Sequence, residues 1–149
     1  MQTSKKGIDF ILRWEKFMAK PYLCPAGVWT IGYGTTILDG KKVDASTPAI
    51  SESKARAVAE EQIKKQFEPG VSRYLSTYKF SQSEFDALVS FHYNTGKIAM
   101  MTRNGTRTKE QIAQKFKEYN LANGRRSNGL VRRRQQEEDI FRKGIYASS

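Results

Sequence analysis

Three side chains with reactive groups lie within one short stretch near the N-terminus. Glu15 offers a carboxyl group, Cys24 is the chain's only cysteine, and Thr30 offers a hydroxyl group, at offsets of nine and then six residues. A helix followed by a turn and a strand could bring such positions together at one corner. Groups of these types can transfer protons and orient water. The stretch 13–36 is therefore the candidate site.

An amphipathic helix is predicted to carry the carboxyl group. Ser4 is a suitable N-cap, and apolar residues such as Ile8 and Leu12 recur on one face of a helix over 4–17. Glu15 continues that face. A carboxyl group among apolar side chains suits the proton donor that cleavage of a glycosidic bond requires. The alternative is an ordinary surface glutamate.

A strand is predicted to carry the hydroxyl group. Two prolines predict a turn or loop over 20–27. Residues 28–35 then alternate as in a strand, with Thr30 beside two glycines on a nearly bare face that another molecule could approach. Asp39-Gly40 is a hairpin dipeptide, so 41–43 should pair back. A β-forming threonine without a chemical role is the alternative.

The remainder of the chain predicts helices. One helix of roughly 16 residues from Ser51 to the Pro69-Gly70 pair is long enough to connect two lobes. Capping sequences at 81–84 and 108–111 open two more helices, and a final helix is predicted over 130–143. The fold class is therefore α+β and mainly helical, with a small N-terminal β-sheet.

The charge balance points to an anionic partner. The chain holds 26 Lys and Arg against 15 Asp and Glu, a net charge of +11. Such a charge attracts nucleic acid, anionic lipid or a bacterial envelope, and does not choose among them. The densest basic patch is formed by Arg125, Arg126, Arg132, Arg133 and Arg134. Interleaved aromatics and a recognition motif are missing, so we expect an envelope-binding or solvated face and no specific nucleic acid.

Other mechanisms lack the residues they need. One cysteine and one histidine, His92, do not make a zinc cluster, and no pattern points to a histidine-centred triad. We expect neither a metal nor a cofactor. Charged residues interrupt the first apolar segment, so we expect no signal peptide and synthesis in a bacterial cytoplasm. Cys24 could also be a buried filler; as a redox sensor it lacks a resolving partner.

The spacing Glu15-x8-Cys24-x5-Thr30 matches the Glu-x8-Asp/Cys-x5-Thr pattern of phage-type lysozymes, glycoside hydrolase family 24. Three further segments resemble that family in the same order. VWTIGYGTT resembles its strand after the catalytic glutamate, and QSEFDALVSFHYNTG resembles its buried helix. NGLVRRRQQEEDIFRKG resembles its C-terminal signature. Together these segments cover the chain nearly end to end.

The resemblance implies a muramidase that hydrolyses the β-1,4 bond between N-acetylmuramic acid and N-acetylglucosamine in peptidoglycan, without metal or cofactor. It also implies a two-lobed lysozyme-like fold with a long connecting helix. We expect one domain over 1–149. Its N-terminal lobe would cover roughly 18–60 and hold the sheet, and its C-terminal lobe would cover roughly 70–149 and pack with the helix over 4–17.

Roles for the three reactive side chains follow from the same resemblance. Glu15 would be the general acid, Cys24 occupies the position where most members have Asp, and Thr30 would help to place the attacking water. A neutral thiol is a poorer base than a carboxylate, so we expect activity with a more alkaline optimum than in a Cys24→Asp variant. Direct attack by the thiolate is the alternative.

Four further positions are assigned by the resemblance. Arg133 is the candidate partner of Glu15. Thr36, Tyr93 and Asn94 would line the cleft.

The leading hypothesis is an endolysin, or a bacterial lysozyme derived from one. It would be a monomer that acts on the wall of an anionic envelope after a separate membrane-permeabilising protein releases it. Two alternatives stay open: a catalytically weak peptidoglycan-binding module, and a basic nucleic-acid-binding domain.

Overall fold

A computed structural model describes residues 1–148. The first half holds α1 (Lys5–Glu15), β1 (Met18–Leu23), β2 (Trp29–Gly32), β3 (Ile37–Leu38), β4 (Lys41–Lys42), α2 (Glu52–Gln62), the π-helical turn η1 (Ile63–Phe67) and α3 (Glu68–Ser72). The second half holds α4 (Leu75–Tyr78), α5 (Gln82–Thr95), α6 (Ile98–Thr102), α7 (Lys109–Lys115), the 3-10 turn η2 (Phe116–Glu118), β5 (Leu121–Ala122), β6 (Arg125–Arg126) and α8 (Asn128–Lys143).

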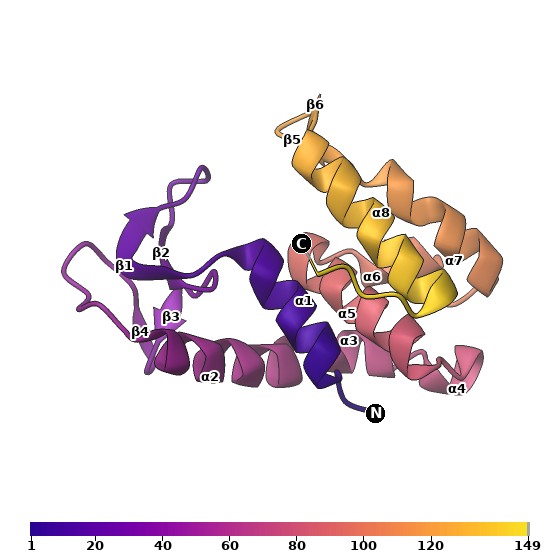
Figure 1. The fold of residues 1–149 in the computed structure, drawn as a ribbon, viewed down its shortest axis with the longest axis horizontal. Helices are drawn as coiled ribbons and strands as arrows, with labels where there is room; N and C mark the ends of the chain where they lie inside the picture. Colours follow the sequence, from indigo (N-terminus) through magenta and orange to yellow (C-terminus); the bar gives the residue numbers. More distant parts are fainter. Residues whose placement is uncertain (149) are drawn as a thin grey trace.

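Figure 1 shows how these elements divide. Strands β1 to β4 lie at one end of the molecule, and α5 to α8 lie at the other. Helix α2 runs from the strands towards the helical part, and α1 lies between the two parts. The structure is therefore α+β and mainly helical, as the sequence predicts. Within residues 1–148, none of the helices is both long and apolar enough to span a membrane.

Helix α1 ends at the residue of greatest interest. The Ser4 side chain accepts a hydrogen bond from the backbone N–H of Gly7 at 3.1 Å, the capping contact expected at this end. At the other end Lys16 leaves the helical region with a φ of 60°. The helix therefore stops two residues before Phe17, and Glu15 is its last residue.

The segment expected to be a loop contains a strand. Strand β1 pairs antiparallel with β2, and the register shifts between Met18 and Tyr22. Pro21 lies in this irregular part, where a missing backbone donor is tolerated. The prediction of a turn or loop over 20–27 was therefore wrong for its first half and correct for the tight turn from Cys24 to Gly27.

Two hairpins form around dipeptides with positive φ. Strands β3 and β4 pair across Asp39-Gly40, with φ values of 51° and 80°, as predicted. Strands β5 and β6 pair across Asn123-Gly124, which sequence reasoning interpreted only as a break. The strands form separate two-stranded sheets and not one small sheet.

The connecting helix is longer than predicted. Instead of stopping at Pro69-Gly70, the chain passes from α2 through η1 into α3. Pro69 lies in the first turn of α3, where its missing N–H costs nothing. The predicted capping boxes at 81–84 and 108–111 are both confirmed, and α8 ends at Gly144 in the left-handed conformation.

A buried carboxylate ties both ends of the chain to α5. Asp86 is 1% exposed and accepts hydrogen bonds from the Ser4 N–H at 3.0 Å, from the Ser4 hydroxyl, and from the Tyr146 hydroxyl at 2.6 Å. Burial and this hydrogen bond raise the pKa of Tyr146. Asp86 thereby fixes the start of α1 and hence the position of its far end.

We predict that Asp86→Ala lowers the free energy of unfolding by about 2–3 kcal/mol, because the Ser4 N–H, the Ser4 hydroxyl, the Tyr146 hydroxyl and the Gln82 amide all lose a buried acceptor. Tyr146→Phe removes one donor and leaves the carboxylate its other partners, so it should cost about 1 kcal/mol. Urea unfolding measures both. Equal effects of the two variants would contradict the central role of Asp86.

Candidate active site

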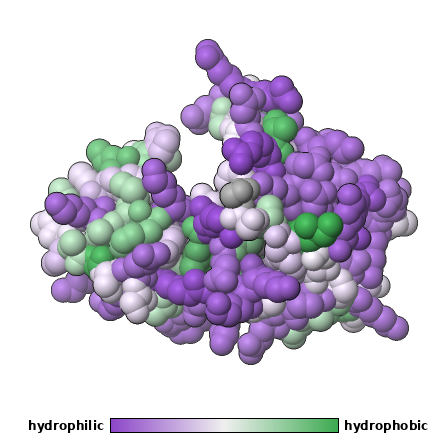
Figure 2. Space-filling view, in the orientation of Figure 1, coloured by the Kyte–Doolittle hydropathy of each residue, from purple (hydrophilic) through white to green (hydrophobic). Residues whose placement is uncertain are grey.

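Glu15 is the last residue of α1. Figure 2 shows an open notch between the strand-containing part and the helical part of the molecule, and in the same orientation the C-terminal end of α1 lies at its floor. The Glu15 side chain is 20% exposed. A carboxyl group at this place is reachable from solvent while most of its surface is covered.

A buried arginine from the other end of the chain holds this carboxyl group. Arg133 Nη1 donates to Glu15 Oε2 at 2.9 Å, and the Arg133 side chain is only 4% exposed. Its Nε donates to Glu137 Oε2 at 3.2 Å, and its Nη2 donates to the Ser90 carbonyl oxygen at 3.3 Å. Three separate partners fix the guanidinium, so Arg133 positions Glu15 and does not move freely with it.

The ionic network continues inward from Arg133. Glu137 is fully buried and also accepts from the Ser90 hydroxyl at 2.6 Å. Arg134 Nε lies 2.9 Å from Glu137 Oε1, close enough for an ion pair although its N–H does not point at that oxygen. Arg134 Nη2 donates to Asn94 Oδ1 at 2.7 Å. Burial lowers the pKa of Arg134, and the Glu137 charge opposes that effect.

The burial of these two arginines corrects one expectation. Arg133 and Arg134 were predicted to belong to a basic surface patch, but they are 3% and 0% exposed. Arg125, Arg126 and Arg132 remain exposed. The basic surface at this end is therefore smaller than the sequence suggests.

The second oxygen of Glu15 faces the backbone at Gly34. This glycine has a φ of 82°, and a Cβ atom there would lie 3.3 Å from Glu15 Oε1 and 3.9 Å from the Tyr93 hydroxyl oxygen. The Tyr93 hydroxyl donates to the Tyr33 carbonyl oxygen at 2.8 Å. Burial and the Glu15 charge raise the pKa of Tyr93, and Arg133 opposes this.

The thiol lies in the turn between β1 and β2 and is partly exposed. The Cys24 N–H and the Thr30 hydroxyl both donate to the Val28 carbonyl oxygen, at 3.0 Å and 2.9 Å. The backbone amide of Val28, and after it the Ala26 amide and the Thr30 hydroxyl, hold the pKa of the Cys24 thiol below its usual value. The Thr30 hydroxyl has one proton, so it must turn away from Val28 to reach the sulfur.

Thr30 is less accessible than predicted. The alternation of residues indicated a bare strand face on its side, but Thr30 is 4% exposed. Both glycines on that face are approached closely, but by groups of this chain. A Cβ at Gly32, in β2, would lie 3.1 Å from Ala55 Cβ, and a Cβ at Gly34, in the turn after β2, would lie 3.3 Å from Glu15 Oε1.

Sequence reasoning missed Tyr22. Burial, and then the charges of Cys24 and Glu15, raise the pKa of Tyr22, so this ring lies within electrostatic reach of both groups. An aromatic residue two positions before the cysteine was a visible signal, but its segment was expected to be a loop.

The three predicted cleft residues lie in different surroundings. Tyr93 lies beside Glu15, as described above. Asn94 is exposed, is held by Arg134, and borders a hollow with Tyr119 and Leu130. Thr36 is half-buried and lines a groove between the β3–β4 hairpin and α2.

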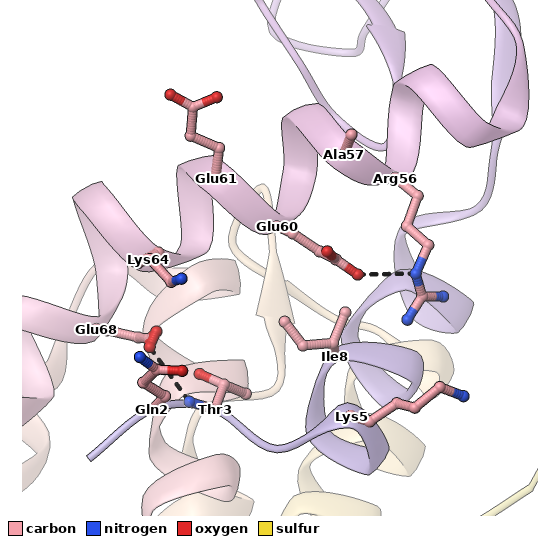
Figure 3. A pocket seen from close by; sticks show the side chains of 10 residues that line it. All are labelled: Gln2, Thr3, Lys5, Ile8, Arg56, Ala57, Glu60, Glu61, Lys64 and Glu68. Carbon is pink, nitrogen blue, oxygen red and sulfur yellow. Dashed lines mark hydrogen bonds and ion pairs between the residues drawn. The ribbon is translucent and has the colours of Figure 1, made fainter.

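Figure 3 shows a different pocket, between the beginning of α1 and one side of α2. Ile8 forms its floor, with Glu60, Lys64 and Glu68 from the helices along its rim. None of the predicted site residues lines it. Two of its carboxyl groups are paired locally: Glu68 accepts from the Thr3 N–H at 3.2 Å, and Glu60 accepts from Arg56 Nε at 2.8 Å.

Comparisons with known proteins identify the family of this chain. A family model described as phage lysozyme matches residues 12–137, and the chain belongs to the phage lysozyme family. It is 30% identical to the endolysin of Acyrthosiphon pisum secondary endosymbiont phage 1, over 95% of this chain and 98% of that protein. The predicted family and fold class are confirmed.

Two other comparisons agree. The chain is 33% identical to the endolysin of Bacillus phage B103 over 97% of its own length, and spans about half, 55%, of that relative. The solved structure of an endolysin from Escherichia coli O157:H7 phage FAHEc1 superposes with a TM-score of 0.74 at 32% identity, covering 99% of this chain and 98% of that one.

We predict that Gly34→Ala lowers the rate of hydrolysis, whereas its loss of folding stability is no larger than that of a control variant. The added methyl group must displace the Glu15 carboxyl group, and about 1 kcal/mol of strain arises from the positive φ. Gly40→Ala is the matched control, because Gly40 has a φ of 80° and open space around it. Both variants should lose similar stability in urea, and only Gly34→Ala should lose about tenfold or more in rate. Equal rates would show that this contact does not matter.

Proposed function

We propose that the protein is a muramidase that hydrolyses the β-1,4 bond between N-acetylmuramic acid and N-acetylglucosamine in bacterial peptidoglycan. The observation that carries this proposal is the Glu15–Arg133 pair at the C-terminal end of α1, the helix end at which the notch opens. A single carboxyl group is fixed there by a buried cation and remains open on one side. Membership of the phage lysozyme family supports the same substrate.

In this proposal Glu15 is the general acid. Arg133 occupies Oε2, so Oε1, which faces Gly34, carries the proton and delivers it to the leaving glycosidic oxygen. The carboxylate that results is stabilised by Arg133, whose position is already fixed by Glu137 and Ser90. No rearrangement of the arginine is needed when charge develops on Glu15.

Cys24 and Thr30 act on the water in this proposal. Cys24 as thiolate accepts a proton from the water that attacks the anomeric carbon, and Thr30 orients that water after its hydroxyl turns from Val28. The turn at Cys24 to Gly27 supports the thiolate, because its backbone amides lower the pKa of the thiol. A cysteine can therefore serve where most family members have an aspartate.

The surface charge suits the surroundings of this substrate. The net charge is +11, and Arg125 and Arg126 are exposed on the β5–β6 hairpin. We propose that these cations draw the protein to an anionic envelope, and that a separate membrane-permeabilising protein gives it access to the wall. One chain supplies both Glu15 and Arg133, which supports action as a monomer.

We predict that Glu15→Gln abolishes lysis of chloroform-treated Gram-negative cells, where chloroform replaces the permeabilising protein. Loss of a general acid should lower the rate by about 10²–10⁴-fold. The measurements are the fall in turbidity and mass spectrometry of released muropeptides. Glu110→Gln is the matched control, since Glu110 is an exposed glutamate that also pairs with an arginine, Arg142, and lines neither the hollow at Asn94 nor the groove at Thr36.

The same assay separates the alternatives. Binding of Glu15→Gln to purified walls should persist, because the substitution removes a proton and not the surface cations. A wild-type protein that binds walls without releasing muropeptides would be a binding module. Affinity for DNA that falls steeply with salt, without lysis, would instead favour a nucleic-acid-binding domain.

We predict that the pH–rate profile contains a limb set by Cys24. The thiolate exists above the pKa of the thiol, so the rate should rise with pH through that value. Because the Val28 amide lowers this pKa, the midpoint should fall below the ordinary cysteine value of about 8.5. In Cys24→Asp the limb should move to acidic pH, since the pKa of an aspartate side chain is about 3.9.

Cys24→Ser supplies the control for this profile. A serine hydroxyl does not ionise in the accessible range, so the limb should disappear and the rate should stay low throughout. Rates are measured on purified peptidoglycan at constant ionic strength. Profiles of the native protein and Cys24→Asp that superimpose would remove Cys24 from the mechanism.

A further inference from the structure

The last turn of α1 contacts α8 at two consecutive residues. Glu15 Oε2 accepts from Arg133 Nη1 at 2.9 Å, and the Trp14 indole Nε1 donates to Gln136 Oε1, also at 2.9 Å. Arg133 and Gln136 are three positions apart on α8 and so lie on one face of that helix. We propose that Trp14 is a positioning residue, which holds Glu15 in place while the Glu15 carboxyl group carries its proton. This inference rests on the proposed function.

The two contacts together fix the orientation of the helix end. Consecutive residues of a helix point about 100° apart around its axis. A contact from Glu15 alone would leave the last turn of α1 free to rotate and to swing around Arg133. A second contact from Trp14, in a different direction, removes that freedom. The Glu15 carboxyl group therefore keeps one position relative to α8.

The end of α1 depends on side-chain contacts of this kind. Lys16 leaves the helical region directly after Glu15, with a φ of 60°, and helix ends fray unless they are held. The Asp86 contacts act at the opposite end of the helix. Arg13 donates to the Ala147 carbonyl oxygen, but that contact is exposed to solvent. The Trp14 hydrogen bond is thus the neutral contact that acts next to Glu15.

The hydrogen bond of Trp14 does not depend on the charge of Glu15. A general acid acts in its protonated form, in which Glu15 offers Arg133 no full negative charge. The contact with Arg133 then loses its ionic part and weakens. An indole and an amide are both neutral, so the bond from Trp14 to Gln136 persists when Glu15 gains its proton. Trp14 therefore holds the helix end in the state that delivers the proton.

The surroundings of Trp14 confine its ring. The side chain is partly buried and packs against the hydrophobic core. The Arg132 guanidinium carbon lies 5.8 Å from the centroid of the ring, and such a cation is attracted to the face of an indole. Arg132 and Gln136 both belong to α8. One helix thus fixes both the ring and its N–H.

The first test measures kcat and KM on soluble glycan strands for Trp14→Phe and Gln136→Leu. Trp14→Phe removes the N–H and keeps an aromatic ring, and Gln136→Leu removes the acceptor. Each variant should lower kcat about tenfold and leave KM within about twofold, because a misplaced acid slows proton transfer without changing the surfaces that bind glycan. A merely structural role would lower the melting temperature and leave the kcat of the folded protein unchanged.

Matched variants identify the hydrogen bond as the cause. Gln136→Glu keeps an acceptor oxygen and should retain the native kcat. Gln135→Leu makes the same substitution as Gln136→Leu at an exposed neighbour, which donates to Asp139, and should also retain it. The double variant Trp14→Phe/Gln136→Leu should be no slower than the slower single variant, since both changes remove one hydrogen bond. Effects that multiply, or a native kcat in both single variants, overturn the inference.

The indole N–H gives a direct spectroscopic signature. The chain has two tryptophans, Trp14 and Trp29, so its NMR spectrum contains two indole N–H signals, which Trp14→Phe assigns. The Trp14 signal should exchange slowly with solvent in the native protein and equally slowly in Glu15→Gln, which removes the charge as protonation does. In Gln136→Leu it should exchange faster, while the Trp29 signal stays unchanged. Fast exchange in Glu15→Gln would contradict the independence from charge.

A further NMR measurement separates this inference from the muramidase proposal. Glu15→Gln introduces a side-chain amide at position 15, whose signals report where that side chain lies. Adding Gln136→Leu should shift these signals, whereas adding Gln135→Leu should not. The result needs no cleavage of glycan, so it stands even if the native protein releases no muropeptides. Amide signals that stay in place when the Trp14 hydrogen bond is broken overturn the positioning role and leave the role of Glu15 to its own assay.

Discussion

The rest of the structure depends on the burial of two arginines and one glutamate beneath Glu15. Arg133, Arg134 and Glu137 are each at most 3% exposed, and their charges would be very costly if any partner were missing. Their mutual contacts, together with Ser90, fix the register of α8 against α5. The cluster also reaches outward to Glu15 through Arg133 and to Asn94 through Arg134, so the network determines where both side chains lie.

The active corner is built by elements that are distant in sequence and depends on shape as well as charge. Helix α1 supplies the carboxyl group, α8 supplies the arginine 118 positions later, and the turn after β2 supplies the glycine that leaves room for the carboxyl group. Asp86 holds the start of α1 to α5. Breaking any one of these contacts would move Glu15 relative to the β1–β2 sheet. The contacts that stabilise the fold therefore also position the Glu15 carboxyl group.

The thiol at position 24 is placed by purely local structure. The Gly27 N–H donates to the Cys24 carbonyl oxygen, and the Cys24 N–H donates to the Val28 carbonyl oxygen. The Val28 amide, followed by the Ala26 amide and the Thr30 hydroxyl, holds the pKa of the thiol below its usual value. All of these groups lie within six residues of Cys24, so the local backbone sets the environment of the sulfur.

The sequence by itself determined the features that depend on near neighbours. Capping boxes, the Asp39-Gly40 hairpin and the spacing of Glu15, Cys24 and Thr30 are all read within a few residues, and the family pattern adds the pairing with Arg133. Tertiary structure alone decided that 18–23 forms a strand despite Pro21, that Arg134 is buried, and that Gly34 faces the acid. Those outcomes depend on contacts between segments far apart in the chain, whose energies no local pattern contains.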